Sequence, residues 1–156
     1  MKYTIEMDIA LPRSRVIELF DTPGNMKEWQ PELLSYDHMS GESGQVGAKT
    51  KMVYQMGNRE IEMVETVTRR NLPDEFVGTY EADGVWNEIA NTFVESSPDS
   101  TQWILTSEFV CSGFFMKMLA AVAPGSFKKQ TRTFMDRFVA FAEGRGSTST
   151  ESAATE

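Results

Sequence analysis

The sequence predicts an α+β domain in which a curved, seven-stranded antiparallel sheet wraps around one long C-terminal helix. Residues 33–112 contain six strand-like runs, many of them rich in Val, Ile, Thr and aromatic residues. Tight turns join these runs, so they form an antiparallel meander. After Gly113 the apolar period becomes helical, because five residues share one helical face: Phe127, Thr131, Phe134, Phe138 and Phe141. This helix must lie on the one face of the sheet that can receive it.

The first 31 residues predict one strand and two short helices. Residues 2–11 alternate between apolar and polar side chains, as a half-buried strand does. Pro12 opens a helix at the position where its missing N–H costs nothing. The stretch "DTPGN" ends that helix, and "MKEWQ" predicts a second short helix that stops before Pro31.

The C-terminal region is predicted to contain a break in its long helix and a disordered tail after it. Pro124-Gly125 interrupts the long helix near its middle, because proline removes a helical hydrogen bond. Two interpretations of this break remain open: a flexible gate at a cavity entrance, or a fixed kink that fits the helix to the curved sheet. Residues 144–156 lack apolar content and predict a disordered tail, so the single domain spans residues 1–143.

Composition excludes several classes of partner. The net charge of −8 over 156 residues argues against nucleic acid or an anionic membrane surface as the main partner. No apolar stretch is long enough to span a bilayer, so no stable membrane insertion is expected. The single Cys111 rules out an intramolecular disulfide and suits a reducing compartment. We therefore expect a cytoplasmic protein, and its protein partners are unknown.

Turn geometry predicts which side chains face the helix. If Asp83-Gly84 and Gly57-Asn58 are two-residue hairpin turns, residues across each turn pair in a fixed register. One face is then mostly aromatic and aliphatic: Met52, Tyr54, Ile61, Met63, Glu65, Phe76, Gly78, Tyr80, Asn87, Ile89, Asn91, Phe93, Trp103, Leu105, Ser107 and Phe109. The opposite face is dominated by charged and polar side chains and is predicted to meet solvent.

Two asparagines on the apolar face need an explanation. An unpaired buried amide costs about 1–3 kcal/mol, so a filled core avoids Asn87 and Asn91. A ligand cavity, in contrast, combines apolar walls with a few polar groups that orient the guest. The alternative is a closed core in which the asparagines bond to each other, to Tyr80 or Tyr54, or to trapped water. The cavity is the favoured interpretation.

Two segments resemble a known superfamily. "LPRSRVIELFDTPGNMKEWQPEL" resembles the opening of START-like helix-grip proteins, and "PGSFKKQTRTFMDRFVAFAE" is similar to the closing helix of their polyketide cyclase/dehydrase and lipid-transport branch. The resemblance covers residues 1–143 and implies a helix-grip fold with a cavity between the sheet and the C-terminal helix. It implies no single function, because the superfamily includes carriers, receptors, cyclases, co-chaperones and oxygenase subunits.

The candidate ligand-binding residues follow from the inward face and the helix stripe. They are Tyr54, Met63, Glu65, Tyr80, Asn87, Asn91, Ser107 and Phe109 from the sheet, with Met118 and Phe134 from the helical region. Glu65 is the candidate for catalysis or specificity, and strand pairing is expected to place it near Gly78. Burial would raise the pKa of its carboxyl unless a partner compensates. The alternative is that Glu65 reaches water at the sheet end or is turned outward by a bulge.

No cofactor or metal site is expected. His38 is the only histidine and has no second histidine or cysteine nearby in the sequence. Gly-rich phosphate loops and CxxC pairs are absent from the sequence, and Cys111 is expected to be an inert buried thiol.

Three function hypotheses follow. The first is an intracellular carrier or sensor for a small hydrophobic or aromatic molecule, lipid-like or polyketide-like. The second is a cyclase/dehydratase-type enzyme that holds a polyketide-like substrate in the same cavity, with Glu65, a tyrosine or an asparagine as acid, base or oxyanion partner. The third is a protein-interaction module, for which the sequence offers no visible apolar surface patch.

Overall fold

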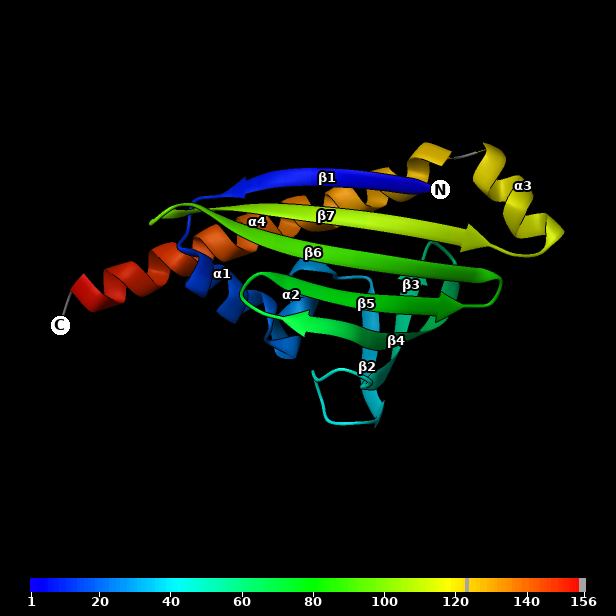
Figure 1. Cartoon of the computed structure of the whole chain (residues 1–156), viewed down its shortest axis with the longest axis horizontal. Coiled ribbons are helices and arrows are strands. Elements are labelled where there is room, and N and C mark those ends of the chain that lie inside the picture. The colour runs from blue at the N-terminus through cyan, green and yellow to red at the C-terminus, as the bar shows by residue number, and fades with distance from the viewer. Residues whose placement is uncertain (123, 155–156) are drawn as a thin grey trace.

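The computed structural model describes residues 1–122 and 124–154, and it confirms the predicted fold class (Figure 1). The elements follow in this order: β1 (Lys2–Ile9), α1 (Arg13–Phe20), a 3-10 turn (Pro23–Asn25), α2 (Met26–Trp29), β2 (Leu33–Ser40), β3 (Lys49–Met56), β4 (Arg59–Asn71), β5 (Glu75–Ala82), β6 (Val85–Ser97), β7 (Ser100–Cys111), α3 (Phe114–Val122) and α4 (Pro124–Ala154). The seven strands form one sheet in the order β1-β7-β6-β5-β4-β3-β2. Every neighbouring pair is antiparallel.

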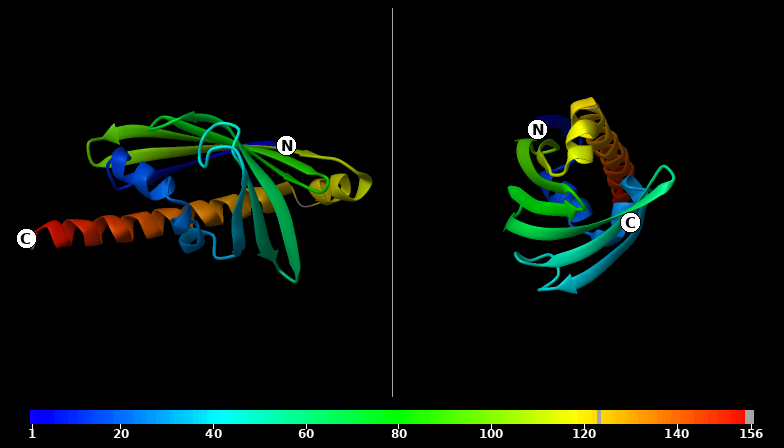
Figure 2. Two further views of the ribbon diagram at one scale, coloured as in Figure 1. Left: turned by 90° about the horizontal axis from the view of Figure 1, so that it is seen from below. Right: turned by 90° about the vertical axis from the view of Figure 1, so that its right-hand side faces the viewer.

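The sheet curves around α4, which runs along its concave side (Figure 2). The short helices α1 and α2 lie at one end of this arrangement, and α3 lies at the other (Figure 1). No helix of the described residues is long and apolar enough to cross a membrane.

The two predicted hairpin turns set the register of the central strands. Ala82 pairs with Val85 across Asp83-Gly84, and Met56 pairs with Arg59 across Gly57-Asn58. Gly57 and Gly84 have φ angles of 63° and 76°, a conformation that favours glycine.

One predicted neighbour is wrong. Glu65 pairs with Tyr80, whereas Val67 is the residue that faces Gly78. The register shifts between Val67 and Arg69, which marks a bulge, and the loop between β4 and β5 is not a two-residue turn. Turn geometry therefore could not fix the register across this loop. The change leaves Glu65 on the inward face, opposite a tyrosine in place of a glycine.

Contacts on both sides hold α4 against the sheet. The Tyr3 hydroxyl on β1 lies 2.6 Å from Thr131 Oγ1 and donates to the carbonyl of Phe127 at 3.2 Å. Further along the helix, Arg137 Nη1 donates to both carboxylate oxygens of Glu32 at 3.0 and 3.1 Å. These contacts tie α4 to β1 at one point and to the segment just before β2 at another.

The helical region divides close to Pro124-Gly125. α3 ends at Val122 and α4 begins at Pro124, while residue 123 lies outside the described part of the chain. At the other end, α4 has a helical backbone as far as Ala154, where composition predicts a disordered tail, because no proline follows Pro124 to end it. This end projects past the sheet (Figure 2). The domain boundary at residue 143 stays a prediction.

Candidate functional site

A cavity of about 570 Å³ lies between the sheet and the helices. Its walls are mostly aromatic, Met and aliphatic side chains, among them Trp29, Met52, Met63, Phe76, Trp103, Phe109, Met116, Phe127 and Phe134. Polar side chains interrupt these walls, chiefly on β2–β6. The volume and the lining suit a small organic molecule.

A hydrogen-bonded cluster around Glu65 is the main polar feature of the cavity. The Tyr80 hydroxyl on β5 donates to Glu65 Oε2 at 2.7 Å, and the Tyr36 hydroxyl on β2 donates to the same carboxyl group. Thr50 on β3 bonds through its hydroxyl to Tyr36. Glu65 is only 6% exposed, so neither a sheet-end position nor a bulge takes it to solvent.

Burial alters the acid–base properties of this cluster. It raises the pKa of the Glu65 carboxyl above its ordinary value, and the hydrogen bonds from Tyr80 and Tyr36 offset only part of this effect. Burial and the neighbouring Glu65 also raise the pKa of Tyr80 and Tyr36, so both phenols keep their protons and remain donors. The arrangement can hold or transfer a proton inside an apolar chamber.

A second polar contact lies on the same wall. The hydroxyl of Tyr54 on β3 donates to Gln30 Oε1, which follows α2, and both residues are buried. Burial is the main cause that raises the pKa of Tyr54. Since the Gln30 oxygen is used, its amide N–H groups are what this residue can offer to a ligand.

The two asparagines have different environments. Asn91 accepts a hydrogen bond from Trp103 Nε1 at 3.0 Å and donates to the carbonyl of Phe76 at 3.5 Å. Asn87 donates from Nδ2 to Ser107 Oγ at 2.8 Å and to the carbonyl of Glu108 at 3.0 Å. Asn91 is thus tied into the core, whereas the bonds of Asn87 use its N–H groups and leave its carbonyl oxygen for a guest.

Eight of the ten candidate residues line the cavity: Tyr54, Met63, Glu65, Tyr80, Asn87, Asn91, Phe109 and Phe134. Ser107 does not line it but is fully buried as the partner of Asn87. Met118 is 47% exposed, and Met116 occupies the lining position on α3. Met116 packs close to Gly84, where an added Cβ would lie 3.0 Å from Met116 Cγ.

Sequence reasoning missed Tyr36 and Gln30. The long loop between β2 and β3 has no defined turn type, so no register could be carried from β3 to Tyr36. Gln30 lies after α2, outside any strand pattern. A bulge between Leu33 and Ser35 puts Leu33 and Tyr36 on the same face although they are three residues apart, so strict alternation could not have placed Tyr36 inward.

The charged residues at the cavity rim are paired. Arg70 contacts Asp21 through two bonds of 2.9 and 2.6 Å and donates to the carbonyl of Gly44 at 3.1 Å. These two residues and Glu65 are the charged side chains among the described residues that line the cavity. Within that part of the chain, no three His, Cys, Asp or Glu residues are placed to hold a metal ion.

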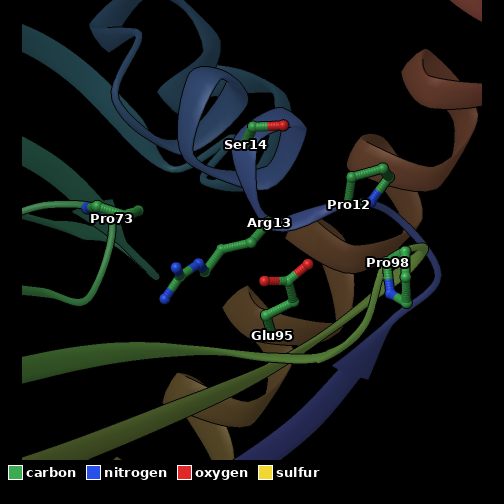
Figure 3. A pocket seen from close by; sticks show the side chains of 6 residues that line it. All are labelled: Pro12, Arg13, Ser14, Pro73, Glu95 and Pro98. Carbon is green, nitrogen blue, oxygen red and sulfur yellow. The ribbon is translucent and has the colours of Figure 1, made fainter.

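A second, smaller pocket of about 300 Å³ lies outside the cavity (Figure 3). It is formed by Pro12, Arg13, Ser14, Pro73, Glu95 and Pro98. The Arg13 guanidinium already bonds to Asp74 at 2.7 Å and to the carbonyl of Phe93 at 3.3 Å. With its cation engaged and no buried titratable group, this pocket is the weaker candidate for a site.

Solved structures share this architecture at low sequence identity. TTHA0849 from Thermus thermophilus aligns with a TM-score of 0.76 at 14% identity, covering 93% of this chain and 99% of that one. The Zhui aromatase/cyclase from Streptomyces sp. R1128 aligns with a TM-score of 0.76 at 13% identity, covering 93% and 94%. Norcoclaurine synthase from Thalictrum flavum, in complex with dopamine and hydroxybenzaldehyde, gives 0.68 at 15%, covering 90% and 85%. At such identities the likeness establishes the fold alone.

The sequence itself matches a family model over most of its length. No curated protein sequence matches the chain. The model described as polyketide cyclase / dehydrase and lipid transport, however, matches residues 1–143. The chain therefore belongs to the polyketide cyclase/dehydrase and lipid transport family.

Proposed function

We propose that this protein binds a small hydrophobic or aromatic molecule in the cavity under α4 and acts as an intracellular carrier or sensor for it. The observation that carries the proposal is the 570 Å³ cavity, whose apolar walls bear one buried polar cluster around Glu65. A filled core would exclude such a cluster or bond it completely, whereas a binding site uses it to orient a guest. Family membership supports the proposal, and the cytoplasmic location rests on sequence composition.

The test is saturable binding of the neutral fluorescent probe Nile red by the folded protein. Met63→Trp would fill part of the cavity, because Met63 lines it, and should weaken probe binding by about tenfold or more. Glu62→Trp is the matched control: the same side chain is added one residue away on β4, where Glu62 is exposed and bonds to Lys51. Absence of saturable binding by the intact fold would overturn the proposal.

A second candidate function is a cyclase/dehydratase-type enzyme that acts on a polyketide-like substrate. One observation favours it: Glu65, with its raised pKa, lies in the cavity beside the phenol donors Tyr36 and Tyr80. A carboxyl of this kind can take a proton from one atom of a substrate and return it to another, while the phenols hold the carboxyl in place. Turnover of an aromatic polyketide precursor that Glu65→Gln abolishes, while Nile red still binds, supports the enzyme. Nile red binding without turnover supports the carrier.

A further inference from the structure

We infer that the cavity selects guests whose apolar body carries a hydrogen-bond-donating head, a hydroxyl or an ammonium group, and rejects guests that carry a carboxylate. The inference rests on the proposed function and specifies its ligand class. It follows from how the hydrogen atoms and the charges of the cavity are distributed. Neither the family match nor the neighbouring structures assign such a preference to this chain.

The hydrogen atoms of the Glu65 cluster are already in use. Tyr80 and Tyr36 both donate to the Glu65 carboxyl, and the Thr50 hydroxyl donates to Tyr36. Each hydroxyl has one hydrogen atom, so the cluster keeps only lone pairs for a guest. An ionised carboxylate accepts about four hydrogen bonds, so the two donors leave Glu65 able to accept more from a guest. While Glu65 is ionised, the cluster therefore offers mainly hydrogen-bond acceptors to a guest.

Further acceptors lie beside the Glu65 cluster on neighbouring strands, so that the acceptors form a row across the sheet. Thr50 pairs with Glu65, Glu65 with Tyr80, and Tyr80 with Asn87, so these residues lie side by side on β3–β6. The N–H groups of Asn87 point to Ser107 and the Glu108 carbonyl, which leaves its side-chain oxygen as an acceptor. A donor head on the guest finds a partner along this row.

The charges of the cavity favour the same guests. Among the described lining residues, Arg70 is the one cation, and it is paired with Asp21 and the Gly44 carbonyl. The basic side chains of α3 and the start of α4 are exposed and do not line the cavity: Lys117, Lys128, Lys129 and Arg132. Residues 119–124 carry no charge in the sequence. A second carboxylate would therefore be buried beside Glu65 without a counter-ion.

The Gln30 amide moderates the selection without reversing it. Its oxygen accepts from Tyr54, so its N–H groups can bond to a carbonyl or ether oxygen of the guest. A neutral amide, however, does not compensate the charge of a carboxylate. Guests with a donor head and a neutral acceptor elsewhere are accommodated.

The experiment compares four guests that share one naphthalene body in competition with Nile red. They are 2-methylnaphthalene, 2-naphthalenemethanol, 2-naphthylmethylamine and 2-naphthoic acid. We expect the alcohol and the amine to bind about tenfold more tightly than the methyl compound, and the acid about tenfold more weakly. The ratio of alcohol to amine tells which donor head, hydroxyl or ammonium, the site prefers.

Comparing Glu65→Gln with the control Glu60→Gln tests whether Glu65 causes the ranking of the four guests. Glu60 is exposed on the same strand, so the control makes the same change outside the cavity. Glu65→Gln should remove the preference for the amine and reduce the penalty on 2-naphthoic acid, whereas Glu60→Gln should leave the ranking unchanged. Circular dichroism establishes that each variant is folded.

The pH dependence of the wild-type protein needs no variant. The groups that face Glu65 are Tyr36, Thr50 and Tyr80, with Tyr54 further along β3, and the α4 side chains Gln130 and Thr131 line the cavity opposite. The phenols keep their protons, so Glu65 is the member of this cluster that changes charge as the solution is acidified. Asp21, the other carboxylate of the lining, is paired with Arg70. The affinity of the amine should fall relative to that of the alcohol as Glu65 takes up its proton.

The outcomes separate this inference from the proposed function. If Nile red binds and 2-naphthoic acid competes as well as the amine, or Glu65→Gln leaves the ranking unchanged, the inference is wrong and the binding function stands. If neither Nile red nor any of the four compounds binds to the folded protein, both fail.

Discussion

The concave side of the sheet has a filled half and a hollow half. In the filled half, the rings of Phe20, Trp29, Phe93, Trp103 and Phe138 lie 5.1–6.4 Å apart, centroid to centroid. In the hollow half, a small cluster of Leu33, Met52 and Tyr54 borders the cavity. The polar groups differ as well: Asn91 bonds to Trp103 in the filled half, while the Glu65 cluster keeps unused acceptors. The filled half therefore supplies close packing, and the hollow half is where we propose that the guest binds.

The largest expected effect is the loss of stability caused by a substitution in the filled half. Phe138 is fully buried against Trp29 and Trp103, so Phe138→Ala should lower the free energy of unfolding by about 3–5 kcal/mol. Met63→Ala, on the wall of the hollow half, should cost about 1 kcal/mol or less, because its side chain already borders empty space. Urea titration measures both. Equal costs would remove the distinction between the halves.

The next effect concerns the polar bond within the filled half. Trp103→Phe keeps an aromatic ring but leaves the Asn91 side-chain oxygen without its indole donor. A buried acceptor without a partner costs about 1–3 kcal/mol, in addition to the lost ring volume. Trp103→Phe combined with Asn91→Ala should cost less than the sum of the single changes, because the two side chains act as a pair. Additive costs would contradict the pairing.

A smaller effect, on the pH dependence of stability, is expected for Glu65 in the hollow half. The pKa of Glu65 is raised above its ordinary value of 4.5, so the folded protein holds this proton more tightly than the unfolded chain. The resulting stability is fully present below pH 4.5 and is lost as the pH rises through the raised pKa. Glu65→Gln stays neutral, so its melting temperature relative to wild type should be higher at about pH 8 than at acidic pH. Thermal melts across this range measure the difference, with Glu60→Gln, the same change at an exposed position, as the control.

The smallest effect is expected outside both halves. Removal of residues 145–156 takes away the end of α4 that projects past the sheet (Figure 2). It retains Glu143, whose carboxylate accepts a hydrogen bond from the Ala10 N–H at 3.1 Å. The melting temperature should stay nearly unchanged, because this segment has little apolar surface to bury. A fall of several degrees would mean that the segment docks on the domain.

The sequence allowed the fold to be predicted wherever a local rule fixes geometry. Two-residue turns fix register, so the pairing of Tyr80 with Asn87 across Asp83-Gly84 and of Thr50 with Glu65 across Gly57-Asn58 could be predicted. The β4–β5 loop and the bulge after Val67 obey no such rule, so the partner of Glu65 was predicted wrongly. The glycine expected beside it is a tyrosine that bonds to it.

The side of the cavity formed by helices was harder to predict for a related reason. The helical period predicts which residues of one helix share a face, but not how a separate helix is rotated about its axis. α4 continues the phenylalanine stripe, so Phe134 was predicted to face the sheet and lines the cavity. α3 is a separate helix that follows Gly113, and its rotation turns Met116 inward and leaves Met118 exposed.

The bond between Asn91 and Trp103 has a geometric consequence for any guest. The Trp103 indole lines the cavity on one side, while Phe93 stacks against it at 6.1 Å and Phe138 lies edge-on at 5.1 Å. Because Asn91 also bonds to the indole nitrogen, moving the ring aside for a longer molecule would break this bond as well as both ring contacts. Trp103 thus acts as a rigid stop, and the protein's own core sets the maximum length of the molecule it can enclose.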